Sequence, residues 1–600
     1  MNPVAIFTPV EAVFEDVEGN FPTFRMLLAD LSLTDTLFWC ARLNLIVSNP
    51  LIADHIAKQQ YGLNIFFTTE EINKVNLFVR EHGGATKVTV FFRGQLLELL
   101  RWACLLCEDK SNDGRSFEDP QIRRKFAQAL LIAGQLWGQR IYGSRFSLNG
   151  GIDLARLRGL GAMRGAMAET SSGINPLQAL GRGQILFAEH FPRQYPAFAD
   201  EFLDITGISV ADYYVCLTAM TANFLNRTPE LIQKGAVYSG VFDINSYANS
   251  VRDELKTLFS KYAYLESQTP QELRGALWGN VELNQLNGSE SYELKPLRQR
   301  PILRVSDGRA IIMDPVFYTE KATVGPLFFL ATSLPKGKVN ELFGAFGKTF
   351  EAYANEIFER MYPARTGLAN RFTKNLKGRD QSGQEIEISD GYLEDVSEAA
   401  FFEMKAVWIR DNVILDDNHD LYLDHLKERY GQSSTAQDRI KGYAQIARAI
   451  KKISQGQGFP NEVDIFRITR VYPVLLVYDS LLDTPVGCSF LNSEFSALLE
   501  PDEILPSGFM RKGQLLVAPL IIMTIDELEA LETSVRHFRL LDLFRDYTDQ
   551  CADRITSLHN FIAATEPYKR QMYANQEVAQ RADELLKTTS QKLFPKANPS

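Results

Sequence analysis

Residues 384–410, QEIEISDGYLEDVSEAAFFEMKAVWIR, decide the fold expected for the C-terminal half of the chain. The first part, Glu385–Asp390, alternates polar with apolar side chains and stops at a glycine, which predicts a strand that leads into a turn. The second part, residues 399–409, is an apolar run interrupted only by Glu403 and Lys405, which predicts another strand. Together they predict a hairpin with two charges inside an apolar strand.

These two charges need an explanation, because an ionised group in an apolar setting costs free energy unless it is paired or binds a metal. Strand residues two apart share a face, so Glu403 and Lys405 lie side by side. The hairpin would also bring Asp390 close to Glu403, and clustered carboxylates suit Mg²⁺. The lysine could then orient a water or stabilise a developing oxyanion. A surface edge strand, or a local Glu403–Lys405 ion pair, is the alternative without chemistry.

In these residues the chain resembles the PD-(D/E)xK nuclease superfamily, which includes many restriction endonucleases, RecB-like nucleases and Holliday-junction resolvases. Asp390 matches the isolated aspartate of the motif, and Glu403-Met404-Lys405 matches its E-x-K part. The chain departs from the motif at Ser389, which stands in the place of the proline. The resemblance covers roughly Asn340–Leu531 and does not extend to the N-terminal half.

Two flanking segments extend the resemblance. Upstream, GKTFEAYANEIFERM (347–361) predicts a helix in which Glu351 fits the G-x-x-F-E pattern often seen one helix before the aspartate strand. Downstream, KGYAQIARAIKKI lies in a segment, 436–453, that predicts an amphipathic helix with Gln445 where many relatives carry a glutamine. Lys441 precedes that glutamine by one helical turn, so both could face the same groove.

The resemblance implies a metal site and a role for each matching residue. Asp390 and Glu403 would bind Mg²⁺ with the backbone carbonyl of Met404, and Mn²⁺ could substitute. Glu351 would hold a water beside the metal or a second metal ion.

The resemblance also implies how the cations and amides of the site would act. Lys405 would position the attacking water or help to deprotonate it. Gln445 and Lys441 would hold the scissile phosphate or orient the lysine.

The whole chain is expected to be multidomain, since 600 residues are too many for one hydrophobic core. Helical periodicity and capping signals such as Thr68 with Glu71 predict a helical N-terminal region. The apolar runs RVYPVLLVYD and GQLLVAPLIIMTI predict strands covered on both faces. The expected parts are a helical domain of unknown role (1–275), a β-hairpin bridge (276–335), an α/β restriction-endonuclease-like domain with a central mixed sheet and C-terminal helices (336–590), and a disordered tail (591–600).

The bridge contains Asp307-Gly308 between PILRV and RAIIM, which is a strong hairpin signal. Arg300, Arg304 and Arg309 lie close together in this segment. They could form one wall of a nucleic-acid-binding groove, or they could be edge charges that discourage strand pairing. The sequence leaves both interpretations open.

The composition limits where the protein works and what it binds. A net charge of −10 requires that any nucleic-acid contact use a local basic patch. The N-terminal apolar run is broken by Glu11 and Glu15, so we expect no signal peptide, and no apolar run is long enough for a membrane span. Six cysteines fit a reducing compartment, and Cys104 and Cys107 are interpreted as core thiols of a helix. The expected location is the cytoplasm, away from membranes.

The expected function is a Mg²⁺-dependent endonuclease that hydrolyses phosphodiester bonds, with DNA as the expected substrate and RNA as the alternative. Defence of a bacterium against phage or plasmid DNA is the setting that fold-level analogy suggests. The competing hypothesis is a catalytically silent module for nucleic-acid binding or assembly. In either case the helical half could bind a partner protein or a trigger, and a homo-oligomer would suit cleavage of both strands.

Overall fold

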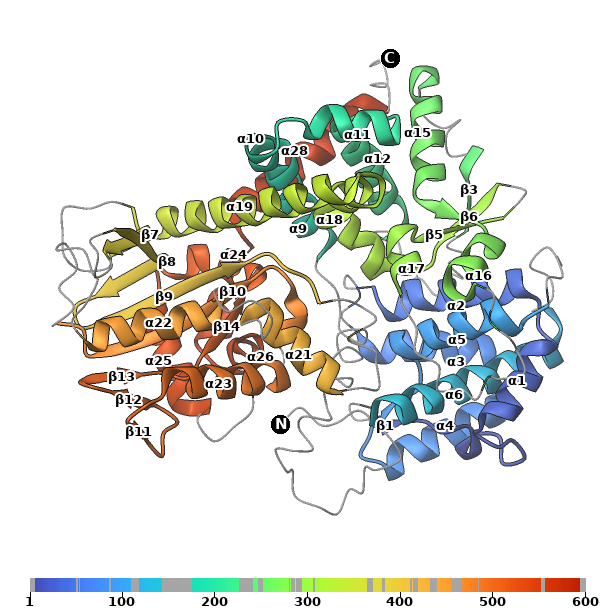
Figure 1. The fold of residues 1–600 in the computed structure, drawn as a ribbon. Helices are drawn as coiled ribbons and strands as arrows, with labels where there is room; N and C mark the ends of the chain where they lie inside the picture. The colour runs from blue at the N-terminus through green and yellow to red at the C-terminus, as the bar shows by residue number, and fades with distance from the viewer. Residues whose placement is uncertain are drawn as a thin grey trace.

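The structure is a computed structural model of the chain. It describes residues 6–49, 52, 54–85, 88–108, 118–142, 175–225, 241–245, 252–279, 281, 286, 294–305, 308–363, 371–379, 384–409, 413, 419–431, 440–455, 467–483, 485–551, 556–572 and 574–593. The protein is multidomain and mainly helical, with a large mixed sheet in its C-terminal half (Figure 1).

The N-terminal helices pack on one another as the sequence predicts. They are α1 (Phe21–Ala29), α2 (Leu33–Val47), α3 (His55–Phe66), α4 (Thr69–Glu81), α5 (Arg93–Leu106) and α6 (Pro120–Tyr142). The capping box at the start of α4 is present, because Thr68 accepts from the backbone of Glu71 and Glu71 accepts from the backbone of Thr68. Cys104 and Cys107 are buried, which confirms them as core thiols.

A second group of helices joins the two halves of the chain. It contains α9 (Pro176–Gln184), a π-helix (Ile185–His190), α10 (Phe191–Gln194), α11 (Phe198–Thr206), α12 (Val210–Phe224), α15 (Asp253–Leu265), α16 (Pro270–Trp278), α17 (Lys295–Gln299), α18 (Pro315–Ser333) and the C-terminal α28 (Gln576–Leu593). The helix α9 lies against both α18 and α28. A Cβ atom at Gly181 would be 2.0 Å from the Val578 carbonyl, and one at Gly183 would be 2.0 Å from the Ala322 carbonyl. Only glycine permits this close backbone approach.

The helix α28 was expected to belong with the C-terminal domain, yet it packs against α9 and α12 of the N-terminal part. Residues 591–593 complete α28, and the rest of the predicted tail lies outside the described residues.

The predicted basic hairpin is confirmed. Strands β5 (Ile302–Arg304) and β6 (Arg309–Ile312) are antiparallel, and Gly308 between them has φ +87°. The hairpin belongs to a four-stranded sheet of order β3-β6-β5-β4, in which β3 is Phe242–Asp243 and β4 is Ser267–Gln268. It is thus part of a small sheet shared with the helical half, and β6 packs against α2.

The large sheet has the order β11-β12-β13-β10-β9-β8-β7, and β14 also pairs with β10. Its strands are β7 (Arg371–Arg379), β8 (Glu385–Asp395), β9 (Glu398–Lys405), β10 (Arg470–Val477), β11 (Glu503–Ile504), β12 (Met510–Lys512), β13 (Leu515–Val517) and β14 (Ile521–Thr524). The strands β7, β8 and β9 form an antiparallel meander, whereas β9, β10, β13 and β14 are parallel. The predicted central mixed sheet is therefore present.

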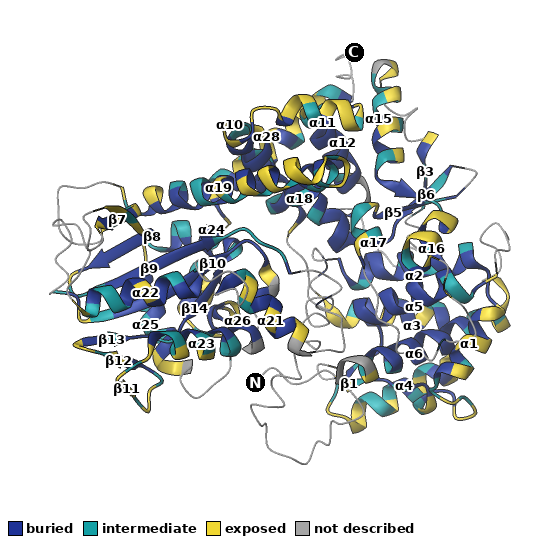
Figure 2. Ribbon diagram, viewed as in Figure 1, coloured by how far each residue is buried: buried dark blue, intermediate teal, exposed yellow. Residues whose placement is uncertain are grey.

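Helices cover the sheet, and its central strands are buried (Figure 2). The flanking elements are α19 (Lys336–Met361), α21 (His419–Tyr430), α22 (Tyr443–Ser454), α23 (Pro485–Leu499), α24 (Ile525–Ser534), α25 (Leu540–Cys551), α26 (Leu558–Ala564) and α27 (Tyr568–Gln571). The helix α22 packs across β8, β9 and β10. On β9, the Phe402 ring lies 4.6 Å from that of Phe358 in α19.

Two predicted strand boundaries are wrong. The strand β8 continues through Gly391 to Asp395, because a Cβ atom there would lie 3.1 Å from the Phe372 ring of β7, so the glycine serves close packing and not a turn. The strand β9 ends at Lys405, so this lysine lies at the strand end and not in its middle.

Among the described residues, no single helix is long and apolar enough to cross a membrane; only α11 and α12 together, with a 61° bend, reach the required length and composition.

Candidate active site

The hairpin β8–β9 brings the predicted residues together as expected. The antiparallel register pairs Gly391 with Phe402, the residues next to Asp390 and Glu403 in the two strands. The backbone N–H of Met404 donates a 2.7 Å hydrogen bond to Asp390 Oδ2. Lys405 forms an ion pair with Glu403, and its Nζ lies 4.0 Å from Asp390 Oδ2. Met404 thus contacts Asp390 through its N–H, and the role of its carbonyl as a metal ligand stays a prediction.

A β-bulge adds Glu387 to this group. Two successive residues of β7 pair with Ser389 and then with Glu387, so the ladder passes over Ile388. In a regular strand Glu387 and Asp390, three residues apart, would point to opposite faces. The extra residue shifts the alternation by one and returns both carboxylates to the same face.

The third carboxylate comes from α19, where the sequence predicts Glu351. Carboxylate oxygens of Glu351, Glu387 and Asp390 all lie within 4.8 Å of one another. We call these three residues the carboxylate cluster. Glu387 was not among the residues predicted from the sequence, because its position depends on the bulge.

Asn375 of β7 supports the carboxylate cluster. In the amide orientation that matches its neighbours, its side-chain nitrogen donates to Glu351 Oε1 at 2.9 Å and to the Asp390 carbonyl at 3.3 Å. Its φ of +47° is a left-handed conformation that asparagine tolerates better than most residues. Asn375 could not be predicted from the sequence, since it lies in a polar strand.

Burial and mutual repulsion raise the pKa values of the acids. Burial, followed by the charges of Asp390 and Glu387, raises the pKa of Glu351 to about 7. Burial and then Asp390 raise the pKa of Glu387, and burial raises that of Asp390 against the lowering effect of Lys405. The cluster therefore concentrates more negative charge than the nearby lysine neutralises, and its oxygen donors fit a hard divalent cation.

The Glu403–Lys405 pair lies at the C-terminal end of β9, next to Asp390 of the carboxylate cluster. Burial raises the pKa of Glu403 to about 8, although Lys405 opposes this shift. Burial lowers the pKa of Lys405, but the charges of Glu403 and Asp390 outweigh it and raise the pKa. The lysine is consequently cationic at neutral pH.

Gln445 belongs to α22, which packs across β8, β9 and β10. The helix α22 begins at Tyr443, so Lys441 precedes it, contrary to the predicted helix. The cause is Gly442, which has φ +50° and whose Cβ would meet the Tyr430 carbonyl at 2.2 Å. The amide oxygen of Gln445 accepts from the Gly442 N–H and caps its own helix. Within the described residues, no hydrogen bond or ion pair joins either residue to the carboxylates.

The three arginines of the small sheet are not brought to the carboxylates. Arg304 donates to the Ser267 hydroxyl at 3.1 Å and lies over the Tyr264 ring. Arg309 begins β6, and Arg300 precedes β5. These strands belong to the small sheet shared with the helical half. The placement of the three arginines therefore does not support the prediction that they line a groove next to the carboxylates.

Comparison of the chain with protein-family models, with curated proteins and with solved structures found no match.

The left-handed backbone of Asn375 leads to a prediction that separates its conformational role from its side-chain role. Asn375→Ala should be less stable than Asn375→Gly by about 1 kcal/mol, because alanine pays the left-handed penalty that glycine avoids. Both variants lose the hydrogen bond to Glu351 and should bind Mg²⁺ a few-fold more weakly. Urea denaturation and Mg²⁺ titration of both variants measure the two effects. Equal stabilities would contradict the strained backbone.

Proposed function

We propose that the protein is a divalent-metal-dependent nuclease whose active site is the carboxylate cluster with Glu403 and Lys405. The observation that carries the proposal is the meeting of Glu351, Glu387 and Asp390 from two separate elements beside a half-buried lysine, Lys405. Asp390 is buried, Glu351 is half-buried and Glu387 is exposed. Burial raises the pKa of all three carboxyls, and neighbouring carboxylates also raise those of Glu351 and Glu387, so a cation between them would favour their ionised forms. A purely structural arrangement would gain nothing from keeping them together.

The residues divide the work of phosphodiester hydrolysis. Asp390, Glu387 and Glu351 would hold Mg²⁺, which when bound lowers the pKa of its water and neutralises charge on the phosphate. Lys405, held by Glu403, places a positive charge beside the site where it stabilises charge that develops on the phosphate oxygens. Asp390 itself is fixed by the Met404 N–H, which orients the carboxylate. DNA is the proposed substrate, and bacterial defence remains the proposed setting by analogy.

The test is cleavage of supercoiled plasmid, linear DNA and single-stranded RNA with Mg²⁺, Mn²⁺ or EDTA. We expect cutting that requires the metal and is lost in Asp390→Asn. Glu385→Gln is the matched control, because Glu385 lies on the same strand but is exposed and pairs with Lys377. Cleavage that survives both EDTA and Asp390→Asn would refute the proposal, whereas metal-independent DNA binding without cleavage would favour the silent binding module.

The raised pKa of Glu351 predicts how metal binding depends on pH. Since this carboxyl has a pKa of about 7, it must lose a proton before it can bind Mg²⁺ at pH 6, but it is already ionised at pH 8. The affinity for Mg²⁺ should therefore rise about tenfold from pH 6 to pH 8. In the metal-free protein, the stability of the fold should change in the opposite direction. A carboxyl whose pKa is raised in the folded state stabilises the fold at low pH, and this stabilisation is lost as the pH rises through 7. Calorimetric titration at pH 6, 7 and 8 checks the affinity, and Glu351→Gln should flatten its rise.

A further inference from the structure

A second group of ligand-type side chains lies at the carboxyl ends of the parallel strands. Asp483 follows β10 and the 3₁₀ helix Ser480–Leu482, Glu527 lies in the first turn of α24 after β14, and His559 lies in the first turn of α26. One ligand atom of each lies within 4.8 Å of the other two. Three segments that are distant in sequence thus converge at the edge of the sheet where ligands of α/β proteins commonly bind.

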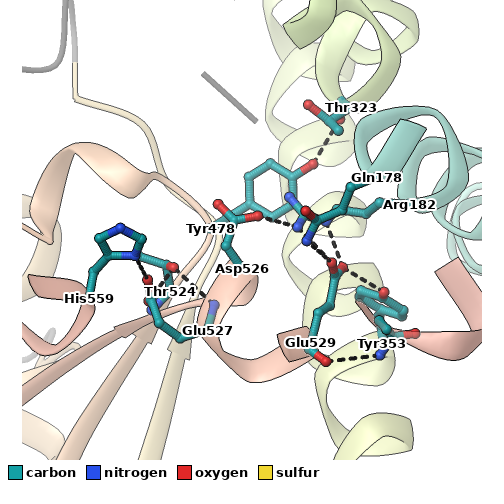
Figure 3. Close-up of polar contacts among 11 residues, drawn as sticks. Gln178, Arg182, Thr323, Tyr353, Tyr478, Thr524, Asp526, Glu527, Glu529 and His559 are labelled. Atoms are coloured by element: carbon teal, nitrogen blue, oxygen red, sulfur yellow. Dashed lines mark hydrogen bonds and ion pairs between the residues drawn. The ribbon is translucent and has the colours of Figure 1, made fainter. Parts of the chain in front are cut away.

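Both carboxylate oxygens of Glu527 have partners, and one of them faces His559. Its Oε2 accepts from the Thr524 N–H at 2.6 Å and from the Thr524 hydroxyl, while Oε1 faces His559 Nδ1 at 3.2 Å (Figure 3). Two ligands bound to Zn²⁺ at about 2.0–2.2 Å in tetrahedral geometry lie about 3.3–3.6 Å apart. The spacing observed between this oxygen and this nitrogen is close to that of two ligands on one ion.

Asp483 supplies an independent observation. The Asp483 carboxyl hydrogen-bonds to the Ser557 side chain and the His559 backbone, but its Oδ1 is shielded from solvent and has no hydrogen-bond partner among the described residues. Buried polar atoms are almost always paired, because a lost partner leaves the desolvation cost unrecovered. An unpaired carboxylate oxygen beside another carboxylate and an imidazole indicates that a cation belongs between them.

We propose that Asp483, Glu527 and His559 form a binding site for a divalent transition metal, with Zn²⁺ as the expected ion. An imidazole nitrogen with two carboxylates suits Zn²⁺ better than Mg²⁺, which prefers oxygen ligands alone. The side chain of His559 is 66% exposed, so one side of the ion would stay open to solvent. The site is distinct from the carboxylate cluster and does not depend on the proposed nuclease activity.

The three side chains also interact with one another in the absence of a metal. The hydrogen bond to Glu527 raises the pKa of His559 to about 9, and the charges of Glu527, Asp483 and Asp526 act in the same direction against burial. Burial, with the charge of Glu527, raises the pKa of Asp483. Zinc binds neutral imidazole and ionised carboxylates, so its binding should release protons and strengthen as the pH rises.

The bound ion would connect three elements of the fold. It would fix the turn after β10 and the start of α26 to α24, since each provides one ligand. Thr524 is level with Val477 of β10, which in turn is level with Lys405 of β9. The metal would therefore stabilise the carboxyl ends of β10 and β14, which lie level with Lys405 at the end of β9.

The experiment is calorimetric titration of the chelator-treated full chain with Zn²⁺ at pH 7.5, in two buffers of different ionisation enthalpy. We expect one equivalent of Zn²⁺ that persists in Asp390→Asn, and a release of protons that makes the observed enthalpy depend on the buffer. His559→Gln and Asp483→Asn should each weaken binding at least about 30-fold. His82→Gln is the control, because His82 is an exposed histidine at the end of α4.

The outcomes separate this site from the carboxylate cluster. A parallel Mg²⁺ titration should be lost in Asp390→Asn and retained in His559→Gln, so failure of one site is visible independently of the other. Because His559 is exposed, circular dichroism of His559→Gln should match that of the parent chain. Absence of Zn²⁺ binding in the parent chain, or Zn²⁺ affinity unchanged in both His559→Gln and Asp483→Asn, would overturn the proposal.

Discussion

Lys405→Met should lower Mg²⁺-dependent cleavage by about 10³-fold, within the range lost when a charged catalytic group or an oxyanion donor is removed. Methionine keeps most of the length and packing of lysine but removes the charge. In the structure that charge is paired with Glu403 and lies 4.0 Å from Asp390 Oδ2, next to the carboxylate cluster. Its loss leaves developing charge on the phosphate without this cation.

The fold should tolerate this substitution for a specific reason. Glu403 is buried, and its pKa is about 8 even with the lysine beside it. Without the cation its pKa rises further, so the Glu403 carboxyl can take up a proton instead of remaining an unpaired buried charge. Circular dichroism and thermal unfolding of Lys405→Met should therefore stay close to those of the parent chain.

Lys377→Met is the matched control for the activity. Lys377 also belongs to the β7–β8–β9 meander and pairs with a glutamate, but its side chain is 58% exposed. Its removal should leave the cleavage rate within about twofold, as expected for an exposed ion pair. A well-folded Lys405→Met protein that cleaves as fast as Lys377→Met would contradict the role of Lys405.

The strands and the polar residues of the site could be predicted from alternation along the chain, whereas the full cluster could not. The proximity of Asp390, Glu403 and Lys405 could be predicted because side chains alternate between the two faces of a strand. Glu351 could be predicted because its helix resembles the one that precedes the aspartate strand in PD-(D/E)xK nucleases. Glu387 reaches the cluster only because the ladder passes over Ile388. That bulge depends on pairing with β7, whose sequence RFTKNLKGR has no regular apolar alternation.

Glycines and prolines show the same limit of local patterns. Gly391 has the appearance of a turn residue, but it lies inside β8 because the Phe372 ring approaches its backbone. Gly442 interrupts an expected helix because the Tyr430 carbonyl occupies the space of a Cβ atom. The run GQLLVAPLIIMTI forms two strands, β13 and β14, separated by a segment with Pro519, which has no N–H to donate to a ladder. In the first two cases a distant segment decides the local conformation.

The packing of the two halves on each other could not be predicted either. The helix α9 of the N-terminal part contacts α24 through a buried network around Arg182, which no local pattern reveals (Figure 3). Arg182 is 1% exposed and donates to both oxygens of Glu529, at 2.6 Å and 2.8 Å. It also pairs with Asp526, and the Tyr353 hydroxyl of α19 donates to Glu529 at 2.7 Å.

Arg182→Met should destabilise the protein by about 3–5 kcal/mol, because it leaves the buried Glu529 carboxylate without its cation. Arg360→Met is the matched control: Arg360 pairs with Glu532 and Glu577 but is 35% exposed, so its loss should cost at most about 1 kcal/mol. Urea denaturation measures both effects. The double variant Arg182→Met/Glu529→Gln should recover part of the loss, since the uncompensated charge is removed.

Hydrogen exchange locates the damage in Arg182→Met. Because the network joins α9, α19 and α24, faster exchange should appear in these three helices before it appears in α1 to α6. Tyr353 lies two residues from Glu351 on α19, so loosening of this helix should also weaken Mg²⁺ binding at the carboxylate cluster. Exchange that increases equally in α1 to α6, or a loss no larger than that of Arg360→Met, would show that Arg182 does not hold the two halves together.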